Sequence, residues 1–544
     1  MSTRINTGLC LSGLLMVLLI SCSRDEQEAG YQPGVELSIL MADLKSQEYL
    51  DMVETMSFPD LRQEWKRVAT PDNYVSFTEK HGGLEKVNTD PQLKNAYDLR
   101  KQTADGFIAL MDKAFTAKGR EPSFTREEAE AFIVTSSKLY SAAENLEKAS
   151  INYVMPARGA KKQWPGFRGP TAQGIARKNK IPLSWSETDN IRWKAELYGR
   201  GNSSPIVWDK KLFITTASED GKVRELLCFN RTDGELRWKK AAPEPKNIEK
   251  LIWKNSYAST TPITDGERVI AFFGNSGFVC YDMDGDLLWT QSAGEFITTH
   301  GPGTNLAMYR DKVILIQDQN RGESVFVALD KNTGEILWNR QREKNLCWAS
   351  PVIVRINGRV EMIYNGSHRV VSYDPDTGEE IWSVNGPSRE AIPMIVTGGG
   401  LIYSQSGRNG PILAIRPGGI GDVTETHIFW QNLTGGPHVP SPVYYQERLY
   451  IIDDTGTLTC INALTGQVIW KERLKGRFTS SPVLSGNKII ITNEKGLTSI
   501  FKAGDSFELL AENDLMEETL ASPAVLGGQI FIRTANHLYC IDKD

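Results

Sequence analysis

A short phrase recurs along this chain and limits what the chain can fold into. Five copies end in tryptophan after a glycine turn, namely CFNRTDGELRW, YDMDGDLLW, ALDKNTGEILW, SYDPDTGEEIW and CINALTGQVIW, and a degenerate copy ends at Trp430. A second phrase ends in proline and alternates with the first, in eight copies: Ser204-Pro205, Thr261-Pro262, Gly301-Pro302, Ser350-Pro351, Ile392-Pro393, Ser441-Pro442, Ser481-Pro482 and Ser522-Pro523. β-rich repeats of about 40–50 residues indicate a β-propeller with one four-stranded blade per repeat.

The repeats predict an all-β, eight-bladed β-propeller over residues 190–544. The last copy, LYCIDKD, stops after a third strand, whereas NIRWKAEL at 190–197 reads as a fourth strand without a blade of its own. Joining the two segments closes the ring and pairs strand edges that would otherwise be exposed. We expect the repeated tryptophan to pack between neighbouring blades, because a large flat ring gains most from such burial.

Cysteine usage indicates packing. Four of the seven cysteines share one position on the predicted third strand, where other repeats carry a small residue. The cysteines are Cys228, Cys280, Cys460 and Cys540, and the residues at the same position elsewhere are Ala328, Ser372, Ala414 and Ser499. We interpret this as a small-residue packing position and not as a disulfide framework or a metal site.

The residues before the ring divide into four parts. Residues 1–22 predict a signal peptide, with Arg4 followed by an apolar stretch too short to span a bilayer. Residues 23–35 read as a tether. Residues 36–155 predict a small α-helical domain, in which Thr125-Arg126-Glu127-Glu128 is a helix-capping box. Residues 156–189 read as a linker and a lead-in to the propeller.

The end of the signal peptide, Leu19-Ile20-Ser21-Cys22, resembles the lipobox of bacterial lipoproteins. The resemblance implies that Cys22 is lipidated and anchors the protein to the membrane. Ser23 follows in place of an aspartate, which in lipoprotein sorting argues against retention in the inner membrane. We therefore expect an outer membrane lipoprotein of the cell envelope, facing either the periplasm or the cell surface.

Charge narrows the classes of partner. The formal net charge is −5 and the isoelectric point is about 5.9, so no basic field favours nucleic acid. We expect a monomeric propeller that binds a protein or a glycan.

Ligands of propellers bind where the interblade loops and the loops between second and third strands meet around the axis. The longest of these loops follows Trp238: 24 residues separate that tryptophan from Pro262, against 11 to 13 in the other repeats. Its Trp253 and Tyr257 are expected to be aromatic anchors. The candidate binding residues on this face are Arg200, Trp253, Asn255, Tyr257, His300, Gln319, Trp348, His368, Arg389, Arg408 and His438. Polar loop residues can also be merely solvated, and no catalytic or metal-binding residue is assigned.

The tryptophan phrase and the S-S-P-V phrase resemble the pyrroloquinoline-quinone-type repeat. Quinoprotein dehydrogenases share this repeat with the propeller lipoprotein of the outer-membrane barrel-assembly machine. The motif Trp164-Pro165-Gly166-Phe167-Arg168-Gly169-Pro170 also resembles the start of many secreted bacterial propellers. The resemblance covers about 164–544 and implies the fold. In the dehydrogenases it also implies pyrroloquinoline quinone with Ca²⁺, beneath two adjacent disulfide-bonded cysteines, whereas no two cysteines are adjacent here.

Three functions stay open. The first is a binding or scaffold lipoprotein that engages a protein or glycan through its loops. The second is an enzyme, either a quinoprotein-type alcohol or sugar dehydrogenase or a carbohydrate-active propeller enzyme. The third is a barrel-assembly subunit. The sequence favours a non-catalytic binding propeller without a cofactor, because it contains no nucleophile elbow, phosphate loop or metal-spaced cluster.

Overall fold

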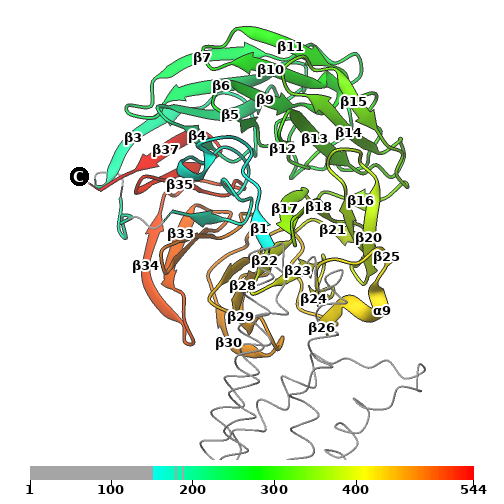
Figure 1. The fold of residues 1–544 in the computed structure, drawn as a ribbon. Coiled ribbons are helices and arrows are strands. Elements are labelled where there is room, and N and C mark those ends of the chain that lie inside the picture. The colour runs from blue at the N-terminus through cyan, green and yellow to red at the C-terminus, as the bar shows by residue number, and fades with distance from the viewer. Residues whose placement is uncertain (1–150, 178–179, 187–188, 544) are drawn as a thin grey trace, which may run out of the picture. The chain divides into compact units, whose positions relative to one another are not determined.

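Strands from Ile151 onward build one ring of blades in the computed structural model, which describes residues 151–177, 180–186 and 189–543. Eight sheets, each built on four antiparallel strands, surround a common axis (Figure 1), so the predicted eight-bladed propeller is confirmed. The predicted lipid site Cys22 and residues 1–150 lie outside the described residues. At the end of the predicted helical domain, Ile151–Tyr153 form strand β1 where the sequence predicted helix. Among the described residues, no helix is long and apolar enough to span a membrane.

Each blade runs from an inner strand A to an outer strand D. In this order, blades 1 and 2 are β4 (Ile206–Trp208), β5 (Lys211–Ala217), β6 (Arg224–Asn230), β7 (Leu236–Ala241), then β8 (Ile263–Thr264), β9 (Arg268–Phe272), β10 (Phe278–Asp282), β11 (Leu287–Gln291). Blades 3 and 4 are β12 (Ala307–Tyr309), β13 (Lys312–Gln317), β14 (Val325–Asp330), β15 (Ile336–Asn339), then β17 (Val352–Ile356), β18 (Arg359–Asn365), β19 (Arg369–Tyr373), β20 (Glu380–Asn385).

Blades 5 to 8 follow the same plan. Blades 5 and 6 are β22 (Val396–Gly398), β23 (Leu401–Gln405), β24 (Ile412–Ile415), β26 (Ile428–Asn432), then β27 (Val443–Tyr445), β28 (Arg448–Ile452), β29 (Thr457–Asn462), β30 (Val468–Arg473). Blades 7 and 8 are β31 (Val483–Ser485), β32 (Lys488–Thr492), β33 (Leu497–Lys502), β34 (Glu508–Asp514), then β35 (Ala524–Leu526), β36 (Gln529–Arg533), β37 (His537–Ile541), β3 (Ile191–Glu196).

A few short elements lie outside the blades. The two-residue strands β16 (Leu346–Cys347) and β21 (Glu390–Ala391) pair in parallel, and β25 (Gly421–Asp422) pairs in parallel with β20 at the outer edge of blade 4. The remaining elements are β2 (Ile175–Ala176), the helix α9 (Thr424–His427) and the 3₁₀ helices Ala160–Lys162 and Gly274–Ser276.

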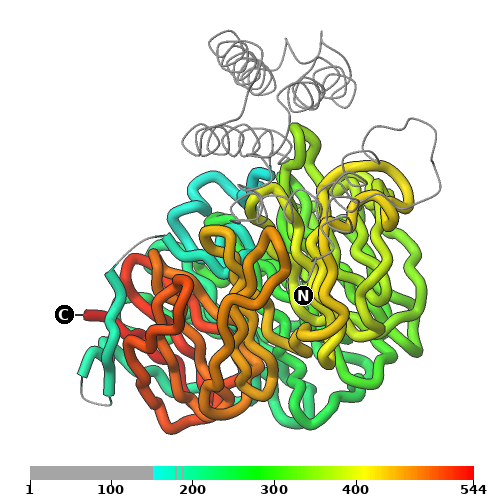
Figure 2. The backbone as a smooth tube through the Cα atoms, turned by 90° about the horizontal axis from the view of Figure 1, so that it is seen from below, coloured from blue at the N-terminus to red at the C-terminus, as the bar shows by residue number. Residues whose placement is uncertain are grey.

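A strand from the start of the propeller closes the ring. β3 pairs antiparallel with β37, with Glu196 opposite His537, and the two strands lie side by side in both views (Figure 1 and Figure 2). This is the split blade that the repeat pattern predicts. A buried arginine adds to the closure, because Arg533 of blade 8 donates hydrogen bonds to Ser203 Oγ (2.8 Å) and to the carbonyl oxygen of Thr215 (2.6 Å) in blade 1.

At five of the eight junctions, the tryptophan of strand D packs against a glycine of the next blade. A Cβ added at Gly334 would lie 2.6 Å from the Trp289 ring of the preceding blade, and the φ angle of Gly334 is +78°. The Trp289 Nε1 also donates to the carbonyl oxygen of Lys331 in that next blade (3.0 Å). Only glycine combines the space and the backbone conformation that this contact requires. The same contact joins Trp193 to Gly234, Trp238 to Gly285, Trp338 to Gly378 and Trp430 to Gly466.

Three junctions depart from this pattern. After blade 6, Trp470 Nε1 donates to the Gly504 carbonyl oxygen (3.0 Å), but a Cβ at Gly504 would meet nothing within 4 Å. Strand D of blade 7 carries Ala511 in place of the tryptophan. The third is the junction between blades 4 and 5. Trp382 is fully buried and donates to Glu361 Oε2 within its own blade (2.7 Å). The residues between β24 and β26, which include β25 and α9, cover the outer edge of β20 at this point. This insertion is the reason why the copy ending at Trp430 is degenerate in sequence.

A small residue stands opposite each of these tryptophans on strand C, as predicted. The pairs are Cys228 with Trp238, Cys280 with Trp289, Ala328 with Trp338, Ser372 with Trp382, Ala414 with Trp430, Cys460 with Trp470, and Cys540 with Trp193. The assignment of Ser499 is wrong: Ile500 holds the position in blade 7 and faces Ala511, so the large and the small residue have exchanged strands. All five cysteines of the described part of the chain are buried and free.

Hydrogen bonds form a ring at the residue two positions before each strand A. The backbone N–H of this residue donates to the side-chain oxygen of its counterpart in the next blade. The bonds run along Ser204, Thr261, Asn305 and Ser350, and along Met394, Ser441, Ser481, Ser522 and back to Ser204. The ring of bonds is interrupted between blades 4 and 5, because the Met394 side chain has no oxygen to accept a hydrogen bond from the N–H of Ser350. The sequence assignment of Gly301-Pro302 and Ile392-Pro393 to this position is wrong, because Asn305 and Met394 occupy it.

The segment Trp164–Ala176, here called the plug segment, lies inside the ring against the A strands. Trp164 exchanges two backbone hydrogen bonds with Val207 of blade 1 (2.8 and 2.9 Å), and the Pro165 carbonyl accepts from Thr264 N–H of blade 2 (2.9 Å). Its last two residues, β2, pair in parallel with β31 of blade 7. Just before the plug segment, β1 pairs with β17 of blade 4 at the centre of the ring (Figure 1).

Side chains of the plug segment reach two further blades. Gln173 Oε1 accepts from the Thr397 N–H of blade 5 (2.8 Å), and the buried Arg168 guanidinium donates to the carbonyl oxygens of Gln173 (2.8 Å) and of Pro442 in blade 6. Burial lowers the pKa of Arg168 to about 9, so the side chain keeps its charge at neutral pH. The plug segment, which the sequence predicted only as a lead-in to the propeller, therefore connects blades on opposite sides of the ring.

The contact between tryptophan and glycine can be tested with a matched pair of substitutions. Gly334→Ala places a Cβ against Trp289, whereas Gly358→Ala meets nothing within 4 Å, although φ is strongly positive at both (+78° and +90°). Both variants carry the cost of a left-handed backbone, about 1–2 kcal/mol. We expect Gly334→Ala to lose about 1–3 kcal/mol more in chemical unfolding, because it also overpacks the junction. Equal losses would show that the blades do not depend on this contact.

Candidate functional site

The interblade loops and the B–C loops emerge on one side of the ring, here called the loop face, because successive antiparallel strands alternate in direction. The A–B and C–D turns form the opposite turn face. The loop between β7 and β8 is the long one that the sequence singles out. Its residues 248–257, here called the strap, cross the loop face.

A buried ion pair holds one end of the strap. Arg224, at the start of β6, donates from Nη1 and Nη2 to the two carboxylate oxygens of Glu249, 2.7 Å each, and both side chains are fully buried. The Arg224 guanidinium carbon lies 4.7 Å from the centroid of the Tyr257 ring. Removing one partner of such a pair leaves an uncompensated buried charge and costs about 3–5 kcal/mol. Arg224 and Glu249 are therefore structural residues of the strap.

The other contacts of the strap reach distant blades. Asn255 Nδ2 donates to the carbonyl oxygens of His300 (2.7 Å) and Pro302 (3.0 Å), in the loop that follows blade 2. Lys254 Nζ lies 2.6 Å from Glu494 Oε1, in the B–C loop of blade 7. Because blade 8 stands between blades 7 and 1, the Lys254–Glu494 ion pair carries the strap across the mouth of the ring.

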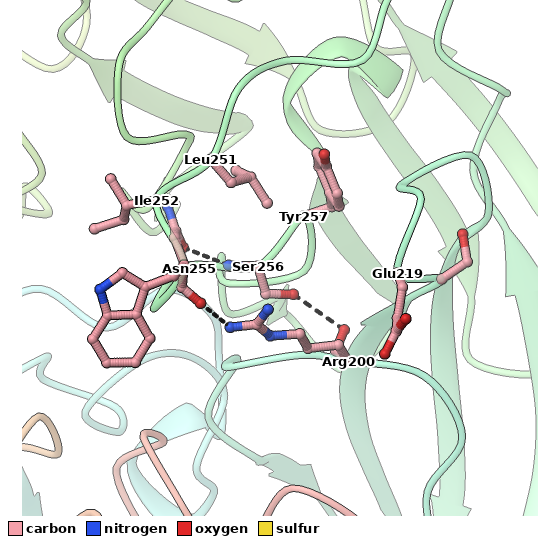
Figure 3. A pocket seen from close by; sticks show the side chains of 9 residues that line it. Arg200, Glu219, Leu251, Ile252, Asn255, Ser256 and Tyr257 are labelled. Atoms are coloured by element: carbon pink, nitrogen blue, oxygen red, sulfur yellow. Dashed lines mark hydrogen bonds between the residues drawn. The ribbon is translucent and has the colours of Figure 1, made fainter.

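A pocket of about 220 Å³ opens beside the strap (Figure 3). One side is formed by strap residues, including Trp253, whose side chain is 83% exposed. Arg200 forms the floor, and its Nη2 donates to the carbonyl oxygen of Trp253. The full lining is Arg200, Ser218, Glu219, Leu251, Ile252, Trp253, Asn255, Ser256 and Tyr257. This pocket brings together four of the predicted binding residues: Arg200, Trp253, Asn255 and Tyr257.

Two of these four residues support the strap itself. Asn255 uses its amide nitrogen in the two bonds to the loop after blade 2, and its Oδ1 accepts from Ser256 N–H (2.8 Å). Tyr257 is half-buried, and its ring occupies the space that a side chain on Gly221 would need. Burial, as the largest cause, raises the pKa of Tyr257. The residues that are free to meet a ligand are Arg200 and Trp253.

The other predicted residues fall into separate places on the loop face. His300 and Trp348 form an edge-to-face pair with ring centroids 5.3 Å apart, and Trp348 Nε1 donates to the Gly301 carbonyl oxygen (2.9 Å). Gln319 is buried and joins its own loop to the loop after blade 2: it donates to the Glu323 carbonyl oxygen and accepts from the Ile297 N–H, 2.6 Å each. His368 and Arg389 have exposed side chains, and the structure does not bring them into the pocket.

Arg408 and His438 meet at a carboxylate that the sequence did not single out. Glu390 Oε2 lies 2.7 Å from Arg408 Nε and 3.4 Å from His438 Nε2, and the backbone N–H of His438 donates to Asp454 Oδ2 (2.6 Å). Burial lowers the pKa of His438, although the carboxylates of Asp454 and Glu390 act in the opposite direction. We read this cluster as a polar link between blades 4, 5 and 6.

Sequence reasoning also missed Glu219, Arg224, Glu249, Lys254 and Glu494. The unusual length of the loop after Trp238 pointed only to Glu249 and Lys254, and no sequence signal pointed to the other three. The KNIEKLIWK stretch of this loop contains three lysines and a glutamate. Buried or fixed at the loop face, such side chains need partners of opposite charge from other loops.

Comparison with known proteins agrees with the repeat. The sequence model of the family described as "Outer membrane protein assembly factor BamB" matches residues 247–392 and 366–506. The predicted resemblance to the pyrroloquinoline-quinone-type repeat family is confirmed, and the matched residues extend from the strap to strand C of blade 7.

Similar proteins differ in what they do. An outer membrane protein assembly factor BamB from Moranella endobia (strain PCIT) is 24% identical over 322 residues, which are 58% of this chain and 66% of that protein. A tetrathionate hydrolase from Acidianus ambivalens is 24% identical over 155 residues, or 25% of this chain and 28% of that enzyme. This chain thus spans 66% or less of the length of these curated relatives.

A solved europium-containing methanol dehydrogenase shares the fold. It superposes with a TM-score of 0.53 at 11% sequence identity, covering 70% of this chain and 98% of that enzyme. At this identity the similarity concerns the fold alone, since one fold hosts many functions.

The residues present do not fit pyrroloquinoline quinone with Ca²⁺. The five cysteines in the described part are buried, free and placed in separate elements, so none forms the adjacent disulfide that the resemblance implies. Ca²⁺ takes six to eight oxygen ligands in proteins. No group of three or more histidine, cysteine, aspartate or glutamate side chains in the described part of the chain is placed to hold a metal ion. We therefore derive no reaction step through this cofactor.

Two substitutions should separate the structural aromatic residue of the strap from the exposed one. Trp253→Ala removes a side chain that is 83% exposed, and we expect it to leave the thermal unfolding midpoint nearly unchanged. Tyr257→Ala opens the space above Gly221 and uncovers the Arg224–Glu249 pair, so we expect a loss of about 1–3 kcal/mol. Matching midpoints for the two variants would contradict the anchoring role of Tyr257.

His438 should make stability depend on pH. Because its pKa in the folded protein lies below its usual 6.5, the unfolded chain takes up a proton first as the pH falls. The free energy of unfolding should therefore decrease as the pH drops from about 6.5 toward the pKa of the folded state. We expect His438→Gln to lose less thermal stability than the wild type over this range. The prediction fails if the two pH profiles run in parallel.

Proposed function

We propose that this chain is a lipid-anchored propeller of the cell envelope that binds a protein partner through its strap, without catalysis of its own. Three observations support the proposal. The repeat is that of a family described as an outer membrane assembly factor, and relatives of that name match the chain. The sequence Leu19-Ile20-Ser21-Cys22 resembles a lipobox. The loop face carries an exposed aromatic side chain on a rigid support.

The observation that carries the proposal is the exposure of Trp253. Its side chain is 83% exposed, and its neighbour Ile252 is exposed as well. The backbone beneath them is fixed by the Arg224–Glu249 pair, the Lys254–Glu494 pair and the Asn255 amide. Holding a large apolar residue in water on a prearranged backbone lowers the entropy cost of binding. Tryptophan is also among the residue types that contribute most to interfaces between proteins.

The position of the chain's first described strand supports the same reading. β1 lies beside β17, with Ile151 opposite Ile356, next to the A–B turn of blade 4 on the turn face. The first described residue, Ile151, therefore lies at the turn face, and β1 leaves the strap on the loop face uncovered.

Site-specific photo-crosslinking in intact cells tests this function. We replace Trp253 with a photo-reactive phenylalanine analogue in the full chain and irradiate. We expect covalent attachment to one envelope protein, because the side chain at this position should lie within the interface. Leu288, which is 48% exposed on the outer strand β11, is the matched control for unspecific apolar contact and should give no product.

Two outcomes would contradict the proposal. Attachment at Leu288 but not at position 253 would place the interface on the outer edge of the blades. Attachment of glycan at position 253, with no protein product, would change the class of partner from protein to glycan.

A further inference from the structure

One cation in the pocket has no carboxylate partner. Among the described residues, Arg224 pairs with Glu249 and Lys254 pairs with Glu494, whereas Arg200 forms no ion pair. The backbone of Arg200 is fixed by two hydrogen bonds with Ala217 (2.7 and 2.9 Å). Its Nη2 is directed to the carbonyl oxygen of Trp253, which orients the guanidinium plane. The remaining N–H groups of Arg200 are available at the pocket (Figure 3).

An apolar surface lies directly beside this guanidinium. Leu251, Ile252 and Trp253 follow one another along the strap and all line the pocket. Ile252 and Trp253 are exposed, and Trp253 supplies the carbonyl oxygen that Arg200 contacts. A ligand bound here therefore meets a fixed cation and an aromatic or aliphatic surface at neighbouring points.

The size of the pocket limits the ligand. Sites for drug-sized molecules measure roughly 300–1,000 Å³. The volume of about 220 Å³ is smaller and suits one or two side chains of a polypeptide better than a whole small molecule. Glu219 lines another part of the pocket, has an exposed side chain and forms no ion pair among the described residues. It would repel a second acidic group.

We propose that the pocket recognises an acidic side chain next to an aromatic or aliphatic one in an extended segment of the partner protein. The proposal rests on the function proposed above and adds the chemistry of the partner. The carboxylate of the partner binds the Arg200 guanidinium, which presents paired N–H groups in the geometry of a carboxylate. The neighbouring apolar side chain lies on Trp253 and Ile252. Glu219 limits the acidic residues to one at this point.

A basic segment is the main alternative, with its cation between Trp253 and Glu219. The structure favours the acidic one because Arg200 is held in place by its backbone and by Trp253, whereas no described residue forms a hydrogen bond or ion pair that orients the Glu219 side chain. A fixed charge loses less entropy on binding than a mobile one.

A displayed library of short random peptides tests the proposal, with the purified full-length protein as bait. We expect enrichment of aspartate or glutamate beside phenylalanine, tryptophan, leucine or isoleucine. Enrichment of lysine or arginine would overturn the proposal, and so would the absence of any enriched peptide. The strongest peptide is then synthesised with both ends blocked, so that only its side chains carry charge, and its dissociation constant is measured.

Variants of the full chain locate the charge that is recognised. We expect Arg200→Ala to weaken binding of this peptide about tenfold or more, a loss of one charge-assisted contact. Arg200→Lys should weaken it less, because the charge stays and the planar fork is lost. Glu219→Gln should leave binding unchanged or slightly tighter. Arg321→Ala removes an exposed arginine of the same face, in the B–C loop of blade 3 outside the pocket, and is the matched control.

Charge reversal protects the test against a folding defect in one variant. Arg200→Glu should lose the acidic peptide and bind a version in which lysine replaces the acidic residue. If neither peptide binds Arg200→Glu while Arg200→Ala binds as the wild type does, Arg200 is not the recognition residue. If Trp253→Ala abolishes binding but every Arg200 variant binds normally, the strap remains the binding site and only the acidic preference is wrong. If Trp253→Ala binds normally, the proposed function itself fails.

Discussion

The contact between a strand D tryptophan and a glycine of the next blade is the constraint on which this propeller depends. The Trp289 ring lies against Gly334 so closely that a Cβ has no room, which fixes both the spacing and the rotation of neighbouring blades. The residue opposite the tryptophan must be small, as Ala328 and the cysteines at this position show, and the turn must accept a positive φ. At the five junctions that contain it, this contact therefore determines three positions of the repeat and leaves the loop face free to differ from blade to blade.

The eight blades could be predicted from the sequence because they follow a local period. The hydrogen-bonded ring could be predicted only in part. Gly301-Pro302 matches the phrase by residue type, but Asn305 holds the position, since an amide oxygen accepts a hydrogen bond as well as a hydroxyl does. The plug segment gave no periodic signal, because its one strand, β2, is two residues long and its partners are mostly backbone groups of distant blades. Its buried Arg168 could be identified only in three dimensions.

Loop length and residue type identified the strap and its exposed Trp253. They could not separate Trp253 from Tyr257, because burial depends on what each ring meets, and Tyr257 meets Gly221 and Arg224. They also missed Glu249 and Glu494, since complementary charges far apart in the chain are paired by the fold and not by their spacing. The predicted Gln319 shows the converse: a polar loop residue that the fold uses to join its own loop to the loop after blade 2.

The separation of β3 from β37 along the chain has a consequence for how the protein is made. Arg192 and Asp542, which form an ion pair across this sheet, are 350 residues apart. At a synthesis rate of about 5–20 residues per second, β3 waits tens of seconds for its partner strand. All residues of blades 1 to 7 are synthesised before then, and the final pairing is non-local and slow. Until this pairing forms, the ring has two open sheet edges, the surfaces through which β-sheet proteins aggregate.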